Sequence, residues 1–268
     1  MEYEGILYRP PSEARSLIIQ VTIGCAHNRC TFCNMYRAKK FRVRSKEEIM
    51  ADLDECRAYY GPMIRRVFFA DGDALVVKTE TLLELLAYVH KNFPAVERIA
   101  SYGTAKDVLK KSEEDLKALA AAGLELIYLG AESGDDKVLE HIKKDVTAAE
   151  IIEAGQKLKR CGLKTSVTLI SGLGGRKGIR EHAVKSAELI NGMRISRDQL
   201  EELMQRLISM DLKTRKALPG MDPNRADVIV SGGLITLEML LAAGCKTLVV
   251  CDDDGLDGYL LCRVAESG

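Results

Sequence analysis

The sequence predicts an α/β protein built from a parallel sheet with helices outside it. Short β-branched apolar runs recur along the chain, and segments with apolar residues at helical spacing alternate with them. Five strand–helix units follow one another in the first 190 or so residues, and parallel neighbours need such crossovers. The sheet would be either curled into a barrel or open and doubly wound. In both cases the ligand site lies at the carboxyl ends of the strands.

The five strands are expected in runs that are rich in Val, Ile, Leu and aromatic residues. Continuous apolar runs of this length are typical of parallel strands buried on both faces. The runs are SLIIQVTI (16–23), RRVFFA (65–70), RIASY (98–102), ELIYLG (125–130) and KTSVTLI (164–170).

The helices between these strands are marked by their ends. The segment 45–61 begins with Ser45 and Glu48, which form the pattern of a capping box, and it ends at Gly61. Three further helices are expected at 78–94, 112–123 and 147–162. The last two have Ser112 and Thr147 as N-caps and Gly123 and Gly162 as C-caps.

Composition excludes some classes of protein. Lys plus Arg equals Asp plus Glu at 39 each, so no global basic field favours a nucleic acid partner. The N-terminus lacks the pattern of a signal peptide, and no apolar run reaches the roughly 18 residues of a membrane span. A soluble, cytoplasmic protein is therefore expected. Its 8 cysteines are expected to be reduced thiols with metal or catalytic uses.

Three cysteines are crowded into the segment GCAHNRCTFCNMY (24–36), directly after the first strand. Cys25, Cys30 and Cys33 could hold three irons of a four-iron cluster, which leaves the fourth iron open for a small ligand. Alternatively, His27 could join them as the fourth ligand of a structural zinc ion. Spacing and position at the mouth of the sheet favour the cluster, and zinc remains the alternative.

These residues carry a resemblance to the radical SAM superfamily. The run VTIGCAHNRCTFCNMYRAKKFRVRSKEEI is followed by FFADGDAL, SYGTAKDVLKKSEEDLKAL, IYLGAESGDDKVL and VTLISGLGGR, so the resemblance covers residues 17 to about 190. It implies a partial (βα) barrel of the TIM-like type. The chain departs from the common cysteine spacing, because four residues rather than three separate Cys25 from Cys30.

The resemblance also implies cofactors and a reaction. Cys25, Cys30 and Cys33 would ligate a [4Fe–4S] cluster whose open iron binds S-adenosylmethionine (SAM). An electron donor such as flavodoxin or ferredoxin would supply the electron that cleaves SAM to methionine and a 5′-deoxyadenosyl radical, which abstracts hydrogen from an unknown substrate. Phe32 resembles the aromatic residue near the adenine, and core packing is its alternative.

Polar residues after later strands are the expected SAM contacts. In the place of the family's glycine-glycine-glutamate segment, Asp71 and Asp73 would accept from the methionine ammonium, and Gly72 would allow close backbone approach. Glu132 and Ser133 would bind ribose hydroxyls or the SAM carboxylate, and Ser101 is a weaker candidate. Each of these segments could instead be a simple strand-to-helix turn.

The chain changes character near residue 192. The segment 193–268 resembles the C-terminal part of the exopolyphosphatase and guanosine pentaphosphate phosphatase family, without that family's phosphate-binding loops. We therefore expect a radical SAM core at 1–192 and an α/β segment at 193–268. KTLVVC (246–251), covered by a helix at about 226–243, could supply a sixth parallel strand beside KTSVTLI. Inactive fusion products and non-enzymatic metal-binding or interaction modules are the alternatives.

Overall fold

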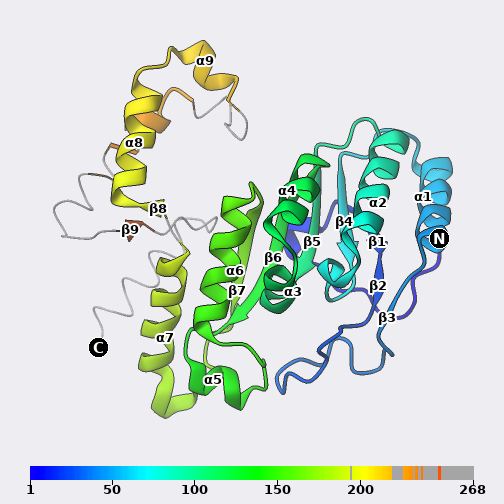
Figure 1. Ribbon diagram of the computed structural model, residues 1–268, viewed down its shortest axis with the longest axis horizontal. Coiled ribbons are helices and arrows are strands. Elements are labelled where there is room, and N and C mark those ends of the chain that lie inside the picture. The colour runs from blue at the N-terminus through cyan, green and yellow to red at the C-terminus, as the bar shows by residue number, and fades with distance from the viewer. Residues whose placement is uncertain (194, 219–225, 232, 235–236, 238–246, 249–268) are drawn as a thin grey trace. The chain divides into compact units, whose positions relative to one another are not determined.

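The computed structural model describes residues 1–193, 195–218, 226–231, 233–234, 237 and 247–248 (Figure 1). The chain divides into two compact units, Met1–Leu189 and Ile190–Gly268. Each unit is described by itself below.

The first unit is built on a five-stranded parallel sheet, as the sequence predicts. The strand order is β1-β4-β5-β6-β7, so each new strand is added beside the previous one without reversal. This winding is the one found in barrels and differs from that of a doubly wound sheet. The strands are β1 (Leu17–Gln20), β4 (Arg66–Ala70), β5 (Arg98–Gly103), β6 (Leu124–Glu132) and β7 (Lys164–Leu169).

Helices line one face of this sheet in Figure 1. Strand residues facing them, such as Ile19, Phe69 and Ile127, are fully buried or nearly so. The helices are α1 (Lys46–Tyr60), α2 (Thr79–Asn92), α3 (Ala105–Lys110), α4 (Glu113–Ala121), α5 (Asp136–His141), α6 (Ala148–Arg160) and α7 (Gly175–Gly192). Two short 3₁₀ turns, η1 (Pro11–Glu13) and η2 (Ala74–Val76), complete the unit.

The predicted N-caps and the C-cap at Gly61 are confirmed, whereas the C-caps of α4 and α6 are Ala122 and Cys161, each one residue before the predicted Gly123 and Gly162. Capping boxes join Ser45 to Glu48 at the start of α1 and Thr147 to Glu150 at the start of α6. Ser112 caps α4 in the same way. Gly61 is the C-cap of α1 and has a φ of 71°, which a residue without a Cβ adopts without strain.

The opposite face of the sheet carries a second cluster of apolar residues. It includes Ile18, Phe68 and Ala100, with Tyr102 and Tyr128 packed edge-on against Phe68. In a barrel this would be the inner face. Strand alternation therefore assigns even-numbered residues of β4 and β5 to the inner face and odd-numbered residues to the helices.

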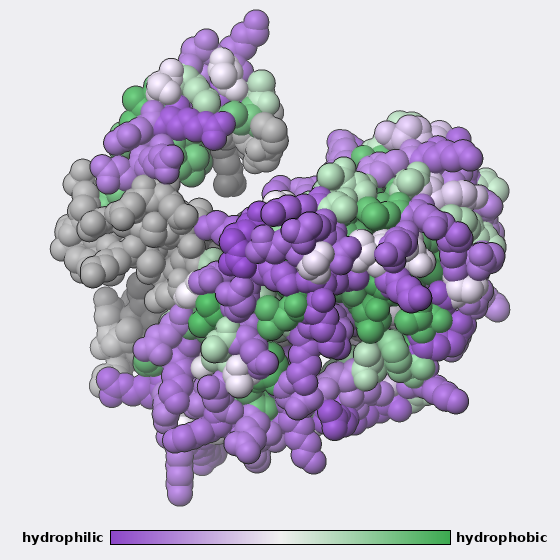
Figure 2. All heavy atoms as spheres, in the orientation of Figure 1, coloured by the Kyte–Doolittle hydropathy of each residue, from purple (hydrophilic) through white to green (hydrophobic). Residues whose placement is uncertain are grey.

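Strand β7 forms one edge of the sheet, and its residues are only partly buried or exposed. This contrasts with β1 at the other edge, where all four residues are buried. The N-terminal segment covers β1, because the Tyr3 hydroxyl donates to the Ile18 carbonyl at 3.1 Å. The face of this unit seen in Figure 2 is largely hydrophilic, with apolar residues in separate patches.

The second unit contains two short strands, two helices and further helical residues at 229–231, 233–234 and 237 in its described part. The strands and the two helices are β8 (Ile195–Ser196), α8 (Arg197–Ile208), α9 (Leu212–Lys216) and β9 (Thr247–Leu248). A small apolar cluster joins Met204 and Leu207 of α8 to Leu237. Among the residues that the structure describes, no helix is both long and apolar enough to cross a membrane.

The prediction that KTLVVC completes the main sheet is wrong. Its residues Thr247–Leu248 pair antiparallel with Ile195–Ser196, whereas completion required a parallel pairing with β7. The pattern of the strand was recognised, but a short β-branched run does not specify its partner. Half of the positions of the helix expected at about 226–243 lie outside the described residues, as do Val249 and Val250, and the described positions 229–231, 233–234 and 237 are helical.

Candidate functional site

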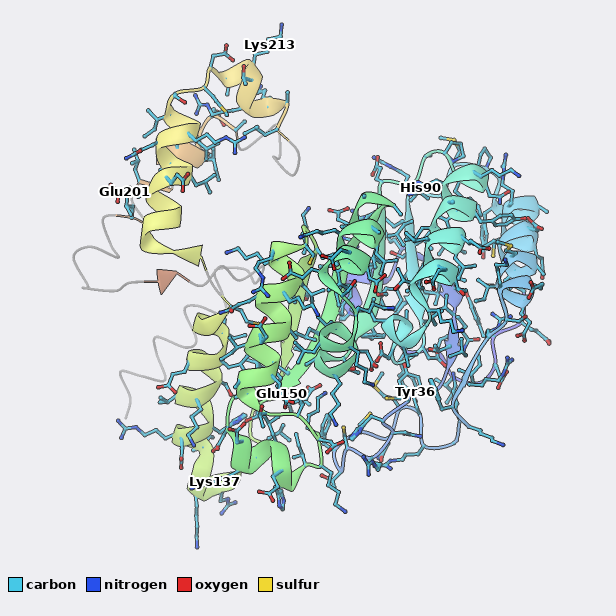
Figure 3. All side chains as sticks on the ribbon, viewed as in Figure 1. Tyr36, His90, Lys137, Glu150, Glu201 and Lys213 are labelled. Atoms are coloured by element: carbon cyan, nitrogen blue, oxygen red, sulfur yellow. The ribbon has the colours of Figure 1, made fainter. Side chains whose placement is uncertain are left out.

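The three clustered cysteines lie on a loop at the carboxyl end of the sheet. This loop follows β2 (Thr22–Ile23), which pairs antiparallel with β3 (Arg42–Val43) and so closes the base of the loop. All three thiols are free and partly exposed. Tyr36 lies in the same loop, at the lower end of the sheet in Figure 3, and is 4% exposed.

The start of the cysteine loop packs directly on the segment after β4. The Gly72 N–H donates to the Gly24 carbonyl at 3.0 Å. A Cβ added to Gly72 would lie 2.8 Å from the Cβ of Cys25, so only glycine permits this approach. The sequence predicted that Gly72 allows SAM to approach the backbone closely. In the structure, the group that approaches Gly72 closely is Cys25.

The middle of the loop is held by the segment after α5. The Thr31 N–H donates to the Ile142 carbonyl at 2.9 Å, and His27 Nε2 lies 2.7 Å from the Lys143 carbonyl oxygen. Arg29 pairs with Asp145 at 3.3 Å. The four residues between Cys25 and Cys30 therefore include two that dock on this segment, and His27 is turned toward a backbone carbonyl.

Asp71 is buried and fully engaged by the protein itself. Its Oδ2 accepts from Lys39 Nζ at 2.8 Å and from the Gly24 N–H at 2.9 Å, and Gln20 Nε2 lies 3.2 Å from both carboxylate oxygens. Asp71 is 0% exposed and the Lys39 side chain is 8% exposed. This carboxylate therefore fixes the base of the cysteine loop through a buried ion pair.

Asp73 is also fully buried, but it has spare hydrogen-bonding capacity. Its Oδ1 accepts from the Leu75 N–H at 3.0 Å, which caps the turn η2. Its Oδ2 has no hydrogen-bond partner among the described residues. Burial, together with the nearby Asp107 carboxylate, raises the pKa of Asp73 well above its usual range.

Asp73→Asn is expected to weaken the pH dependence of stability. The buried carboxyl holds its proton in the folded chain but loses it in the unfolded chain above about pH 4, so stability should fall as pH rises. Asn cannot ionise, and it should reduce that fall. Urea unfolding of the metal-free protein between about pH 4 and 7 measures it. Asp54→Asn, at an exposed position of α1, is the control, and equal slopes in both variants would contradict the prediction.

Glu132 lies at the end of β6, beside the cysteine loop. Its backbone has a φ of 66°, and its carboxylate pairs with Lys144 at 3.1 Å. Lys144 also affects the pKa of the Cys30 thiol. Burial raises the pKa of the Cys30 thiol, and the Lys144 ammonium partly offsets this, whereas the neighbouring thiols and Glu132 raise it further. Glu132 therefore neutralises a cation that lies close to the cysteines.

Ser133 is buried and linked to α7. Its hydroxyl lies 2.8 Å from His182 Nδ1 and accepts from the Asp135 N–H at 2.9 Å. Next to it, a Cβ added to Gly134 would lie 2.0 Å from the Lys185 carbonyl oxygen, so α7 touches the backbone of this turn. The Ser133 hydroxyl therefore already has two partners in the protein.

The two remaining predicted contacts lie in different surroundings. Ser101 pairs in register with Phe69 and Ile127, so its side chain faces the helices, and its hydroxyl is buried without a partner among the described residues. Phe32 is half-buried in the cysteine loop. Phe32, Gly72 and Glu132 thus accompany the cysteines at one end of the sheet, whereas Ser101 is on the helix side.

The loop suits a cluster better than a single zinc ion. His27, the fourth donor that a zinc ion would need, lies with its Nε2 2.7 Å from the Lys143 carbonyl oxygen. A zinc site needs four donors within about 2.3 Å of one point. A four-iron cluster takes each thiolate on a different iron, so its ligands are spread apart. Three free thiols on one anchored loop match the number of protein ligands that a cluster with one open iron takes.

Several residues of the site were not predicted. Gln20, Lys39 and Lys144 hold the acidic residues in place, and Arg37 binds loop carbonyls. Lys39 and Asp71 are 32 residues apart, and no local spacing signals such a pair. The only hint was the cation-rich stretch RAKKFRVRSK after the cysteines.

Two family models match the chain. The model "Radical SAM superfamily" matches residues 19–190, and the model "Ppx/GppA phosphatase family" matches residues 133–256. The two matches overlap at 133–190, so the second begins upstream of the change in character expected near residue 192.

Curated relatives resemble the two parts separately. An uncharacterized methyltransferase of Pyrococcus horikoshii is 25% identical over 157 residues, which is 58% of this chain and 32% of that protein. The hopanoid C-3 methylase of Methylococcus capsulatus is 24% identical over 155 residues (57% and 28%). Exopolyphosphatase 2 of Mycobacterium tuberculosis is 36% identical over 104 residues (37% and 31%). The chain spans about a third of the length of these relatives.

A solved structure resembles the fold. The radical S-adenosylmethionine methyltransferase TsrM of Kitasatospora setae, with cobalamin and a [4Fe–4S] cluster bound, matches with a TM-score of 0.52 and 19% identity. The match covers 65% of this chain and 34% of that one. At this identity the likeness supports the fold, a parallel sheet of the partial-barrel type.

Proposed function

The chain belongs to the radical SAM superfamily, and from this premise we propose that it binds a [4Fe–4S] cluster through Cys25, Cys30 and Cys33 and cleaves SAM reductively. The observation that carries the proposal is one loop with three free, partly exposed thiols, anchored at the carboxyl end of a parallel sheet. When bound, the cluster supplies the electron that converts SAM to methionine and a 5′-deoxyadenosyl radical.

The protein's own residues prepare the site. Asp71 and Lys39 fix the base of the loop, and Gly72 allows Cys25 to sit against the backbone of the next strand end. Ile142 and Lys143 hold its middle. In the proposed complex, Phe32 lies near the adenine, and Glu132 and Ser133 lie near the ribose or carboxylate of SAM. Donation from the Ser133 hydroxyl to the SAM carboxylate requires it to give up its bond to His182 Nδ1.

The test is anaerobic reconstitution of the full chain with iron and sulfide, followed by dithionite and SAM. The proposal expects a brown protein that forms 5′-deoxyadenosine. A colourless protein that binds one zinc ion tightly would favour the non-enzymatic alternative and overturn the proposal. The substrate is proposed only as a compound from which the radical abstracts hydrogen. The electron donor in the cell is proposed only as a class of protein, such as flavodoxin or ferredoxin.

Asp73→Ala should weaken SAM binding by about 1.5 to 3 kcal/mol, the range for hydrogen bonds to charged groups. Asp73 has a side-chain oxygen without a partner among the described residues, and it would accept from the methionine ammonium once the carboxyl loses the proton that it holds without SAM, whereas the oxygens of Asp71 are occupied. Calorimetric titration of the reconstituted protein measures the affinity. The cluster absorbance should stay at the wild-type level, and an unchanged affinity would show that Asp73 only caps its turn.

A further inference from the structure

Arg37 makes an unusual set of contacts in the cysteine loop. Its guanidinium donates to three backbone carbonyls, at 2.6 Å to Asn28, 2.7 Å to Cys30 and 3.2 Å to Cys33. Two of these carbonyls belong to expected cluster ligands. One side chain therefore joins the middle and the end of the loop.

The charge of Arg37 is not neutralised by a carboxylate. Three other arginines of the same stretch each pair with an acidic side chain, whereas Arg37 has no such partner among the residues that the structure describes. Those three are Arg29, Arg42 and Arg44. The positive charge of Arg37 therefore lies beside the backbone of Cys30 and Cys33 without a neutralising carboxylate.

The contacts also orient the peptide groups of the loop. In a trans peptide the C=O and the following N–H point in opposite directions. The N–H groups of Arg29 and Asn34 therefore point away from the guanidinium, and neither has a backbone or side-chain partner among the described residues. Free N–H groups near an iron–sulfur cluster can donate to its sulfurs, which raises its reduction potential.

We propose that Arg37 is a positioning residue of the cluster loop: it holds the carbonyls of Asn28, Cys30 and Cys33 outward, keeps the loop shaped for the cluster, and raises the cluster's reduction potential. The inference rests on the proposed cluster at the three cysteines. Arg37 itself contacts neither the thiols nor SAM in this role. It acts through the backbone and through its charge.

Three variants separate the two effects. Arg37→Gln removes the charge and the fork of donors, and Arg37→Lys keeps the charge but cannot span three carbonyls. Lys40→Gln is the matched control, because Lys40 is exposed in the same loop and makes no hydrogen bond or ion pair among the described residues. It removes the same charge without touching the carbonyls.

The first measurement is hydrogen exchange of the metal-free protein, which does not depend on the cluster. The Thr31 and Cys33 amides, which donate to the Ile142 and Cys30 carbonyls, should exchange about ten-fold faster or more in both Arg37 variants, and at the wild-type rate in Lys40→Gln. Equal exchange rates in Arg37→Gln and Lys40→Gln would show that Arg37 does not hold the loop through its carbonyls. If the wild type takes up no cluster, the proposed function fails while this measurement still decides whether Arg37 shapes the loop.

The second measurement uses the reconstituted protein. An iron chelator should remove the cluster about ten-fold faster from both Arg37 variants than from wild type. The reduction potential should become more negative in Arg37→Gln, and less so in Arg37→Lys, because lysine keeps the charge that favours the reduced cluster. A potential in Arg37→Gln that equals that of Lys40→Gln would overturn the proposed tuning.

Discussion

Replacing any one of Cys25, Cys30 or Cys33 with Ala should abolish the brown chromophore of the reconstituted protein. Each thiolate is expected to ligate a different iron, and no spare cysteine lies in the same loop. Iron content and visible absorbance after anaerobic reconstitution measure the result. The thiols are partly exposed, so Ala at these positions should leave the fold intact.

Cys56→Ala and Cys161→Ala are the matched controls. Both thiols are buried, in α1 and at the end of α6, away from the loop. They should keep full cluster content, although a smaller side chain in the core costs some stability. Loss of the chromophore in Cys161→Ala to the same extent would mean that the ligands are assigned wrongly. Cys245 lies outside the described residues, so it is not used as a control.

Asp71→Ala should lower the free energy of unfolding by about 3 to 5 kcal/mol, the cost of breaking a buried ion pair. The change leaves the Lys39 ammonium in a site where its side chain is 8% exposed, and it removes the acceptor of the Gly24 N–H. Urea unfolding of the metal-free protein measures the loss. Because this pair fixes the base of the cysteine loop, cluster uptake should fall as well.

Two further variants test the cause. Glu97→Ala removes one partner of the exposed pair with Arg65 and should cost at most about 1 kcal/mol. Adding Lys39→Met to Asp71→Ala should recover part of the lost stability, because it removes the uncompensated charge. If Asp71→Ala costs no more than Glu97→Ala, the ion pair does not hold the loop.

Local signals predicted most of the first unit. Capping residues such as Ser45 and Thr147 act on the next turn of their own helix, so sequence patterns reveal them. The antiparallel pair of β2 and β3 was missed because each strand has two residues and no periodicity. The partner of KTLVVC was predicted wrongly, because pairing depends on the rest of the fold.

In the candidate site, too, local features could be predicted from the sequence and long-range partners could not. The cysteines lie within nine residues of one another, and their crowding is visible in the sequence. The roles of the acidic residues depend on partners far along the chain. Lys39 occupies Asp71, and His182 lies against Ser133 from a helix 49 residues away. Residue type predicted that these side chains are polar and buried near a site, but it could not tell which of them already have partners.

The docking of the cysteine loop on the segment after α5 sets an order of events during biosynthesis. His27 and Arg29 bind residues 116 positions later in the chain. At roughly 5 to 20 residues per second, about 6 to 23 s pass between the synthesis of the two segments. Throughout that interval the thiols sit in a loop that lacks its second anchor. The cluster is therefore expected to be inserted only after both segments have been synthesised. Until then the thiols are unprotected, so the absence of oxygen and of competing metals matters most while the chain is still growing.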